Sequence, residues 1–286
     1  MTRRPTRRDR RTVLRGLAVG AVGLTGLAGC LENGGDGESE DNPFAADGGD
    51  GGTDGSDAGD DSGGSAGGDG SAGSDGSGGS DGDDLGDLEI GVVEDGSALA
   101  DHPSVRNLAG QPYFGPPPGE GTGTVVAFED TSCSRCASFE EGTVEKIRTD
   151  LAASGDATFV FRGYPILYPS TSEPACTVLE ATLAHSPRAH FAMAREYFSN
   201  QNEYSADNVW DRSESRLNDL TDLDGAAVVA DARDGAYDAA VETDVAAGEA
   251  AGASVTPAVF MFRDGEFRTK ASGSLSFEAV ETALGL

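Results

Sequence analysis

The chain has 286 residues, of which 50 are acidic and 20 are basic, and its formal net charge is −30 at pH 7. So acidic a surface disfavours electrostatic binding to nucleic acid or to anionic lipid headgroups. The 42 glycines are concentrated in one region, and about one medium-sized domain remains once that region is set aside. The excess of acidic residues is typical of proteins that stay soluble at high salt, where screening removes the self-repulsion.

The first thirty residues have the features of an export signal. A basic stretch with three arginine pairs precedes an apolar, glycine-rich stretch at residues 16–29, which is too short to cross a bilayer of about 30 Å. The sequence around Arg10 and Arg11 resembles a twin-arginine export signal, which implies passage across the membrane in a folded state. We therefore expect a signal peptide and not a transmembrane helix.

The apolar stretch ends in Leu27-Ala28-Gly29-Cys30, which resembles a lipobox. This resemblance implies that Cys30 is the lipidated first residue of the mature protein. The protein is then exported and anchored to the outer face of the cell membrane through the lipid on Cys30. A cleaved signal with an incidental cysteine is the alternative, because short motifs also occur by chance.

Residues 31–87 consist mainly of Gly, Ser, Asp and Ala. So few apolar side chains cannot offset the entropy lost on ordering, and we expect this segment to be disordered. Its acidic charges repel one another and extend the chain. On an anchored Cys30 it is a tether that holds residues 88–286 away from the membrane.

Residues 125–139 carry the pattern around which the rest of the chain is organised. Residues 125–128 are β-branched or aromatic apart from one alanine and predict a buried strand. After a polar turn, apolar positions recur at helical spacing: Cys136, Phe139, Val144, Ile147 and Leu151. Cys133 and Cys136 are therefore expected at the start of a helix.

That position favours redox chemistry. The unpaired N–H groups and the dipole of a helix N-terminus stabilise an anion, and Arg135 adds a positive charge of the kind that lowers a thiol pKa. The two-residue spacing lets Cys133 attack a disulfide of a partner as a thiolate and lets Cys136 resolve the mixed disulfide. No cofactor is needed, because the sulfur pair is itself the redox centre.

The neighbouring segments predict an α/β domain. Residues 157–163 predict a second strand, parallel to the first through a right-handed crossover. Residues 257–262 and 266–271 predict a hairpin around an Asp-Gly turn, and a last helix begins at Ser276. We expect a short strand or lead-in at residues 88–93 and an irregular segment at 103–118, which contains five prolines.

Residues 173–251 are alanine-rich and interrupt this α/β pattern. An insertion of about eighty residues is long for a crossover and is consistent with a helical cap on an α/β core. Pro174 and Pro187 suit first-turn positions of helices. The expected helices span residues 174–185, 187–200, 206–217, 225–234 and 237–250.

With these motifs in place, residues 121–286 resemble the DsbA-like thiol:disulfide oxidoreductases of the thioredoxin superfamily. The resemblance implies a thioredoxin-like α/β fold with an inserted all-helical subdomain, and protein thiols or disulfides as partners. Residues 252–260 resemble the cis-proline loop of that family. The resemblance places Thr256 and Pro257 beside Cys133, where they dock an extended substrate and keep metal from the thiols.

The chain departs from the family pattern at two points. Many members have a buried acid six residues before the first cysteine, where this chain has Ala127. Glu129 and Asp130 lie four and three residues before it and could substitute through water. The dipeptide between the cysteines is Ser-Arg, so the family's redox potential cannot be transferred to this chain.

Other interpretations of the cysteine pair remain open at this stage. The pair could be a structural disulfide in an inert surface lipoprotein, or it could bind a soft metal ion such as Cu(I). Zinc needs three or four ligands, and the sequence has no second pair of cysteines at ligand spacing. An exchange enzyme also needs a recycling redox partner, which the sequence does not identify. Cys176 is expected to be a buried small side chain, and a third reactive thiol near the active site is the alternative.

Overall fold

The computed structural model describes residues 85–286. The predicted export signal with Arg10 and Arg11, the lipidation site Cys30 and residues 31–84 of the predicted tether lie outside the described residues. Leu85, which the sequence analysis placed in the tether, is only 2% exposed and packs in the hydrophobic core. Of the residues described, no helix has both the length and the apolar character needed to cross a membrane.

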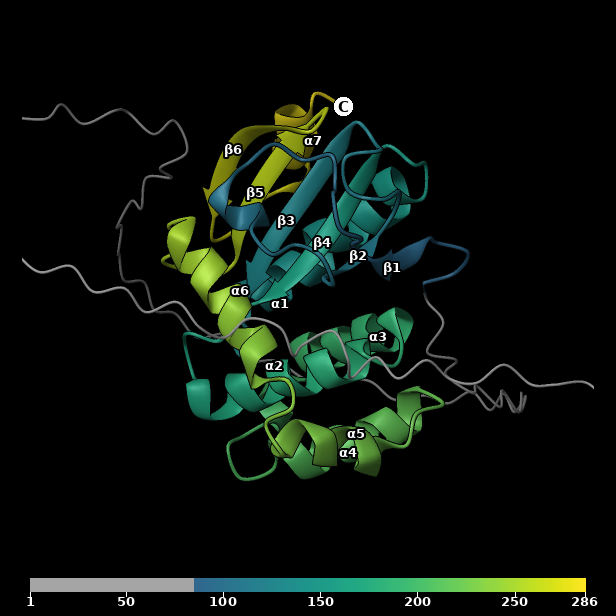
Figure 1. Cartoon of the computed structure of the whole chain (residues 1–286), viewed down its shortest axis with the longest axis vertical. Coiled ribbons are helices and arrows are strands. Elements are labelled where there is room, and N and C mark those ends of the chain that lie inside the picture. The colour runs from purple at the N-terminus through teal and green to yellow at the C-terminus, as the bar shows by residue number, and fades with distance from the viewer. Residues whose placement is uncertain (1–84) are drawn as a thin grey trace, which may run out of the picture. The chain divides into compact units, whose positions relative to one another are not determined.

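A six-stranded mixed sheet with the order β1-β2-β4-β3-β5-β6 forms the centre of the described part (Figure 1). The β3–β4 pair is parallel and the β5–β6 pair is an antiparallel hairpin, as the strand-helix-strand and hairpin patterns predicted. The pairs β1–β2, β2–β4 and β3–β5 are antiparallel as well. The strands are β1 Ile90–Val92, β2 Pro112–Phe114, β3 Gly123–Glu129, β4 Ala157–Gly163, β5 Ala258–Arg263 and β6 Glu266–Ser272.

Strand β3 is buried along its whole length, because both faces of the sheet are covered. Side chains alternate between the faces of a strand. Val125 and Ala127 belong to the core cluster that contains the two cysteines, whereas Val126 and Phe128 belong to a second cluster on the opposite face. Glu129 at the end of the strand therefore falls on the face of the cysteines.

Helices cover both faces and one end of the sheet. The first face carries α1 Ser134–Phe139, the π-helical segments Glu140–Val144 and Ile147–Ala152, and α7 Phe277–Leu284; the second carries α6 Asp238–Ala250 and a 3₁₀ helix, Pro103–Val105. The remaining helices gather at the end of the sheet where β3 and β4 terminate (Figure 1). They are α2 Pro169–Leu183, α3 Pro187–Ser199, a 3₁₀ turn Gln201–Glu203, α4 Val209–Leu220 and α5 Gly225–Arg233.

Two predictions of secondary structure need correction, and a third gains a detail. Residues 103–118 are not wholly irregular, because β2 lies within them and joins β1 to β4. Pro174 lies inside α2 and not in a first turn. Because proline has no N–H group, the carbonyl of Ser170 lacks its helical partner, and Ser170 is an exposed residue. The helix after Cys136 continues to Ala152 as predicted, but with π-helical turns.

A buried ion pair fastens α6 to the sheet. Oδ1 of Asp244 accepts hydrogen bonds from Nε and Nη2 of Arg162 at 2.8 and 2.7 Å and from Nε2 of Gln111 at 2.8 Å. The Nη1 group of Arg162 donates to the carbonyls of Ser104 and Arg106 at 3.0 and 2.9 Å. A charge sequestered in this way is costly when its partner is removed.

We expect Asp244→Ala to lower the free energy of unfolding by about 3–5 kcal/mol, because it leaves the Arg162 guanidinium buried without its counter-charge. The double variant Arg162→Met with Asp244→Leu should lose less, since it removes both charges. Urea unfolding measures both. The control Glu242→Ala, on the exposed face of α6, should change stability by at most about 0.5 kcal/mol. Equal effects for Glu242→Ala and Asp244→Ala would contradict the prediction.

Candidate active site

The two cysteines lie where β3 passes into α1. Cys133 is the N-cap residue of α1, and Cys136 lies one turn later. Both are free thiols in buried residues, and Cys133 is 2% exposed. Cys133 nevertheless lines an open groove of about 780 Å³, so a partner sulfur can approach it from that side.

The surroundings of Cys133 favour its thiolate. They lower its pKa from the ordinary value of 9.0 to about 5. The largest cause is a hydrogen bond from the Cys136 thiol, and burial opposes it. The side chain of Thr256 and the backbone N–H groups of Cys136 and Arg135 add further hydrogen bonds to the sulfur. Cys133 thus has the electrostatic environment of a reactive thiol.

The structure changes the role expected of Arg135. The sequence analysis assigned the lowering of the thiol pKa partly to the guanidinium charge, whereas the contact that lowers the Cys133 pKa comes from the backbone N–H of Arg135. The Arg135 side chain is exposed, and its guanidinium lies beside Gly273. A Cβ atom placed on this glycine would be 3.5 Å from Nη1 of Arg135. Backbone N–H groups at the start of α1 thus contact the sulfur, and the charge of Arg135 is not among the causes that lower the pKa of Cys133.

Cys136 has the opposite character. Its pKa is raised far above the ordinary thiol value, chiefly by burial, with further contributions from the hydrogen bond to Cys133 and from the charges of Glu129 and Cys133. Cys136 therefore holds its proton under conditions in which Cys133 has lost its own. One thiol is prepared to attack or to leave as an anion, and the other is not.

Glu129 is the ionisable group buried against this pair. It is fully buried, and neither carboxyl oxygen has a hydrogen-bond partner among the described residues. Burial raises its pKa well above the ordinary 4.5, and the neighbouring charges of Glu140 and Cys133 raise it further. The sequence analysis named Glu129 only as a substitute acting through water. The alternation of β3 is the signal that identifies it, because Glu129 shares the face of Ala127.

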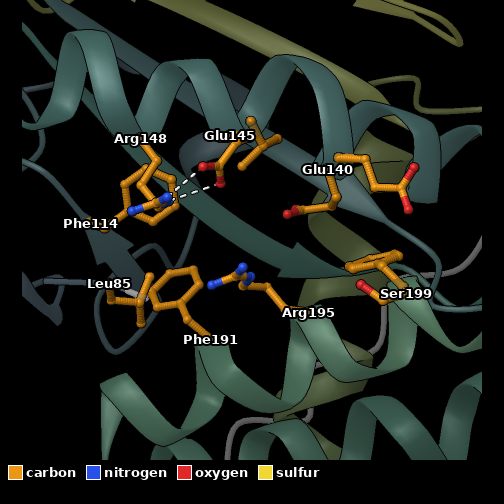
Figure 2. Close-up of a pocket in the computed structure, with 11 residues that line it drawn as sticks. Leu85, Phe114, Glu140, Glu145, Arg148, Phe191, Arg195 and Ser199 are labelled. Carbon is orange, nitrogen blue, oxygen red and sulfur yellow. Dashed lines mark hydrogen bonds and ion pairs between the residues drawn. The ribbon is translucent and has the colours of Figure 1, made fainter. Parts of the chain in front are cut away.

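Glu140 connects this buried carboxyl to a small pocket. Burial raises the pKa of Glu140 to about 7, against the lowering effects first of its contact with Glu129 and then of the Arg195 charge. Glu140 lies on the π-helical segment after α1 and Arg195 on α3, and both line a pocket of about 240 Å³ (Figure 2). Glu129 and Glu140 together form a pair of carboxyls that resists double ionisation.

The loop before β5 lies against Cys133. The Thr256-Pro257 peptide is cis, and the Cys133 thiol donates a hydrogen bond to the Thr256 carbonyl at 3.4 Å. Thr256 is buried, and its hydroxyl has no other partner among the described residues. The structure thus brings Cys133, Cys136, Arg135 and the Thr256-Pro257 loop together from segments more than a hundred residues apart.

Asp130 fixes the turn that carries Cys133. Its Oδ1 accepts hydrogen bonds from the backbone N–H and the hydroxyl of Ser132 at 2.8 and 2.5 Å. Its Oδ2 accepts from the backbone N–H groups of Ile166 and Leu167, both at 2.7 Å. A carboxylate saturated in this way has a structural role, because it organises two loops at the edge of the groove.

Gln201 holds the same turn from the helical side. Its Nε2 donates to the carbonyls of Thr131 and Cys133 at 2.8 and 3.0 Å. Sequence reasoning missed this residue, since nothing local in a 3₁₀ turn seventy residues away indicates such a contact. Within residues 85–286, no three His, Cys, Asp or Glu side chains are grouped so that they could hold a metal ion.

A family model described as thioredoxin matches residues 119–284. The chain belongs to the thioredoxin family. The resemblance inferred from the cysteine pair and the Thr-Pro loop is thereby confirmed at the level of the family. No curated protein matches this chain.

Solved structures of other proteins show the same fold. Oxidised BdbD from Bacillus subtilis is 20% identical with a TM-score of 0.54, and the match covers 66% of this chain and 100% of BdbD. The thiol-disulfide exchange protein alpha-DsbA2 from Wolbachia pipientis is 18% identical with a TM-score of 0.51, covering 64% and 89%. DsbA from Chlamydia trachomatis is 14% identical with a TM-score of 0.51, covering 60% and 87%. The predicted thioredoxin-like fold with a helical insertion is therefore confirmed.

We expect the thiolate of reduced Cys133 to titrate with a midpoint near 5. The far-ultraviolet absorbance of the thiolate and the pH dependence of alkylation by iodoacetamide both report it. In Cys136→Ala the midpoint should rise, because the largest stabilising hydrogen bond is lost. It should stay below the ordinary value, since the backbone N–H groups remain. An unchanged midpoint in Cys136→Ala would contradict this assignment.

We expect Glu129→Gln to change how stability depends on pH. Because the folded-state pKa of Glu129 is raised, the folded protein keeps a proton that the unfolded chain has lost, and the free energy of unfolding falls as the pH rises above 4.5 toward the folded-state pKa. Each unit of difference is worth about 1.4 kcal/mol. The stability of Glu129→Gln relative to the unmodified protein should therefore increase from about pH 5 to pH 8.

Thermal unfolding at a series of pH values measures this change. The exposed neighbour Glu141 provides a matched control, and Glu141→Gln should follow the unmodified protein at every pH. If the curves of Glu129→Gln and of the unmodified protein ran parallel across this range, Glu129 would not have a raised pKa.

Proposed function

We propose that this protein is an extracytoplasmic thiol:disulfide oxidoreductase that exchanges disulfides with other proteins through Cys133 and Cys136. The observation that carries the proposal is the asymmetry of the two thiols, because the pKa of Cys133 is lowered to about 5 while that of Cys136 is raised. A structural disulfide has no need of this asymmetry, whereas an exchange reaction does. The exchange activity in the description of the Wolbachia relative supports the same reaction class.

The reaction is written from the disulfide form. A thiolate of the client protein attacks the sulfur of Cys133, a mixed disulfide forms, and the bond to the Cys136 sulfur breaks. Because the raised pKa of Cys136 disfavours its anion, the Cys136 sulfur takes a proton as it leaves, and Glu129 can donate that proton since its own raised pKa keeps it protonated. A second client thiolate attacks the client sulfur of the mixed disulfide, and Cys133 leaves as a thiolate. The client loses two electrons as its disulfide forms, and the cysteine pair gains them.

Thr256 and Pro257 would dock the client. In this proposal the client backbone lies extended against the loop before β5, beside the sulfur it attacks. The contact of Cys133 with the Thr256 carbonyl supports this placement, because it puts the loop within hydrogen-bond distance of the nucleophile. Arg135 contributes its backbone N–H to the stabilisation of the thiolate.

The low pKa of Cys133 favours donation of the disulfide. At pH 7 a thiol of pKa about 5 is stabilised by roughly two units, or about 2.7 kcal/mol, relative to a thiol that stays protonated. Because 30 mV corresponds to about 1.4 kcal/mol, this amounts to about 60 mV toward the reduced form. Once reduced, the pair needs a recycling oxidant, which is an unidentified redox partner in this proposal.

The proposed location comes from the sequence of the first 84 residues. Arg10 and Arg11 belong to the motif that resembles a twin-arginine signal, and Cys30 belongs to the motif that resembles a lipobox. In this proposal residues 1–30 are the signal, Cys30 carries the lipid that anchors the protein to the outer face of the membrane, and an acidic tether leads to a folded part that begins near Leu85. An oxidising compartment suits the disulfide form.

We expect the purified protein, oxidised with glutathione disulfide, to form the disulfide of a reduced two-cysteine peptide. Cys133→Ala should abolish the reaction. Cys136→Ala, which glutathione disulfide converts to a Cys133–glutathione disulfide, should trap a mixed disulfide with a one-cysteine peptide, because neither Cys136 nor a second client thiol can then displace it. The matched control Cys176→Ala removes a thiol buried away from the groove and should stay active. The reduction potential should be less negative than the roughly −270 mV of thioredoxin, whose thiol pKa of about 7 stabilises its reduced form less. Full activity of Cys133→Ala would contradict the proposal.

A further inference from the structure

The groove beside Cys133 differs in charge from the rest of the protein. Residues 85–286 contain 33 acidic and 13 basic residues, yet of the described residues that line the groove only Arg135 is charged. The other lining side chains offer hydroxyl and amide groups or apolar surface, among them Tyr168, Thr171, Gln201, Asn202, Tyr204 and Ser205. The groove around the reactive sulfur is therefore neutral to positive, although the protein as a whole is strongly acidic.

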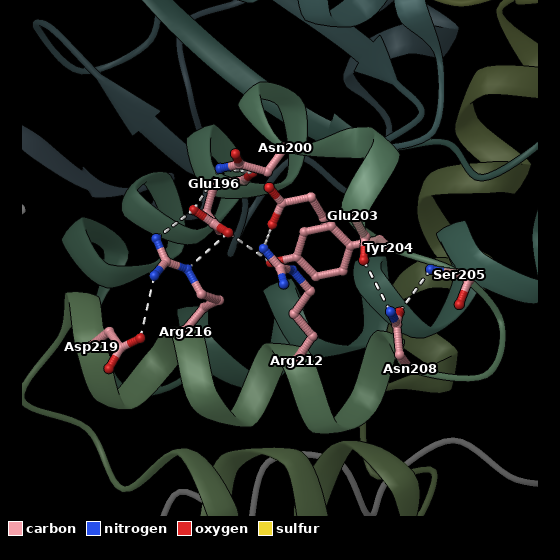
Figure 3. Close-up of polar contacts among 9 residues, drawn as sticks. All are labelled: Glu196, Asn200, Glu203, Tyr204, Ser205, Asn208, Arg212, Arg216 and Asp219. Carbon is pink, nitrogen blue, oxygen red and sulfur yellow. Dashed lines mark hydrogen bonds and ion pairs between the residues drawn. The ribbon is translucent and has the colours of Figure 1, made fainter.

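Carboxylates near the groove are directed inward or paired with arginine. Both carboxylate oxygens of Asp130 accept hydrogen bonds, from backbone N–H groups and from a hydroxyl. Glu196 forms a two-point ion pair with Arg216, with distances of 2.9 Å from Nε to Oε1 and from Nη2 to Oε2 (Figure 3). Glu203, which adjoins the lining residues Asn202 and Tyr204, is paired with Arg212 in the same view. Asp207, next to Ala206 at the rim, is the exposed exception.

Arg135 leaves its charge available at the mouth of the groove. Its side chain is exposed, and no ion pair to it is present among the described residues. The thiolate of Cys133 uses the backbone N–H of Arg135, so the guanidinium is not required for that contact. A guanidinium held in the first turn of α1, two residues from the attacking sulfur, can pair with a carboxylate that flanks the client cysteine.

We propose that the groove selects client segments in which the reacting cysteine is flanked by aspartate or glutamate, and that Arg135 is the specificity-determining residue. This inference rests on the proposed exchange activity and names its substrate class. Two acidic proteins repel each other wherever their carboxylates approach. The groove removes that repulsion at the reacting sulfur and replaces it with one attractive contact. A client as acidic as this protein can then bring its cysteine to Cys133.

The experiment uses the oxidised full chain and three reduced two-cysteine peptides of identical length, in which the residues beside the cysteines are Asp, Asn or Lys. Rates are measured in about 0.1 M salt, where the Debye length is about 10 Å, because higher salt would screen the exposed ion pair itself, and Arg268→Gln controls for the change in net charge. The readout is the ratio of the rates of Arg135→Gln and of the unmodified protein for each peptide. This ratio cancels the different intrinsic reactivities of the peptide thiols.

We expect Arg135→Gln to slow the Asp peptide about two- to fivefold relative to the Asn peptide, in keeping with a solvent-accessible ion pair. The Lys peptide should keep its rate or gain. The control Arg268→Gln removes the same charge from an exposed position on β6 outside the groove and should leave all three ratios equal. Equal ratios for the three peptides with Arg135→Gln would overturn the inference while the exchange activity stands. No exchange even with uncharged dithiothreitol would overturn both.

Discussion

The hydrogen bond from the Cys136 thiol to the Cys133 sulfur is the contact on which the proposed chemistry depends. The same contact is the largest cause of the lowered pKa of Cys133 and contributes to the raised pKa of Cys136. A single proton between two sulfurs therefore separates their roles. The fold maintains this geometry by starting α1 at Cys133, so that backbone N–H groups point at one sulfur while the sheet buries the other.

Much of this arrangement could be predicted from the sequence, because the relevant signals are local. Strand β4 lies at the predicted residues, and β3 extends the predicted strand by two residues at its start and by one at its end. The Thr256-Pro257 loop was found through the family resemblance, since no local property of a Thr-Pro peptide places it beside a cysteine. Strand β2 was missed because it has three residues and begins with a proline, which is an unfavourable pattern for a strand.

The electrostatics of the site could not be predicted in the same way. The pKa of Glu129 depends on what packs around the end of β3, and Glu140 and the cysteines come from a different element. The contribution of Arg135 was assigned to its charge, because a sequence shows the side chain and not the direction of an N–H bond. Such assignments need distances, which only the folded chain supplies.

The two hydrogen bonds of Gln201 have a mechanical consequence. One amide on the 3₁₀ turn after α3 holds the carbonyls of both Thr131 and Cys133, so this part of the helical insertion and the loop with the nucleophile form a single rigid rim. The insertion cannot swing away from the sulfur at this point unless both bonds break. In the proposed reaction, a client cysteine would therefore reach Cys133 through the groove as it stands, without movement of this part of the insertion.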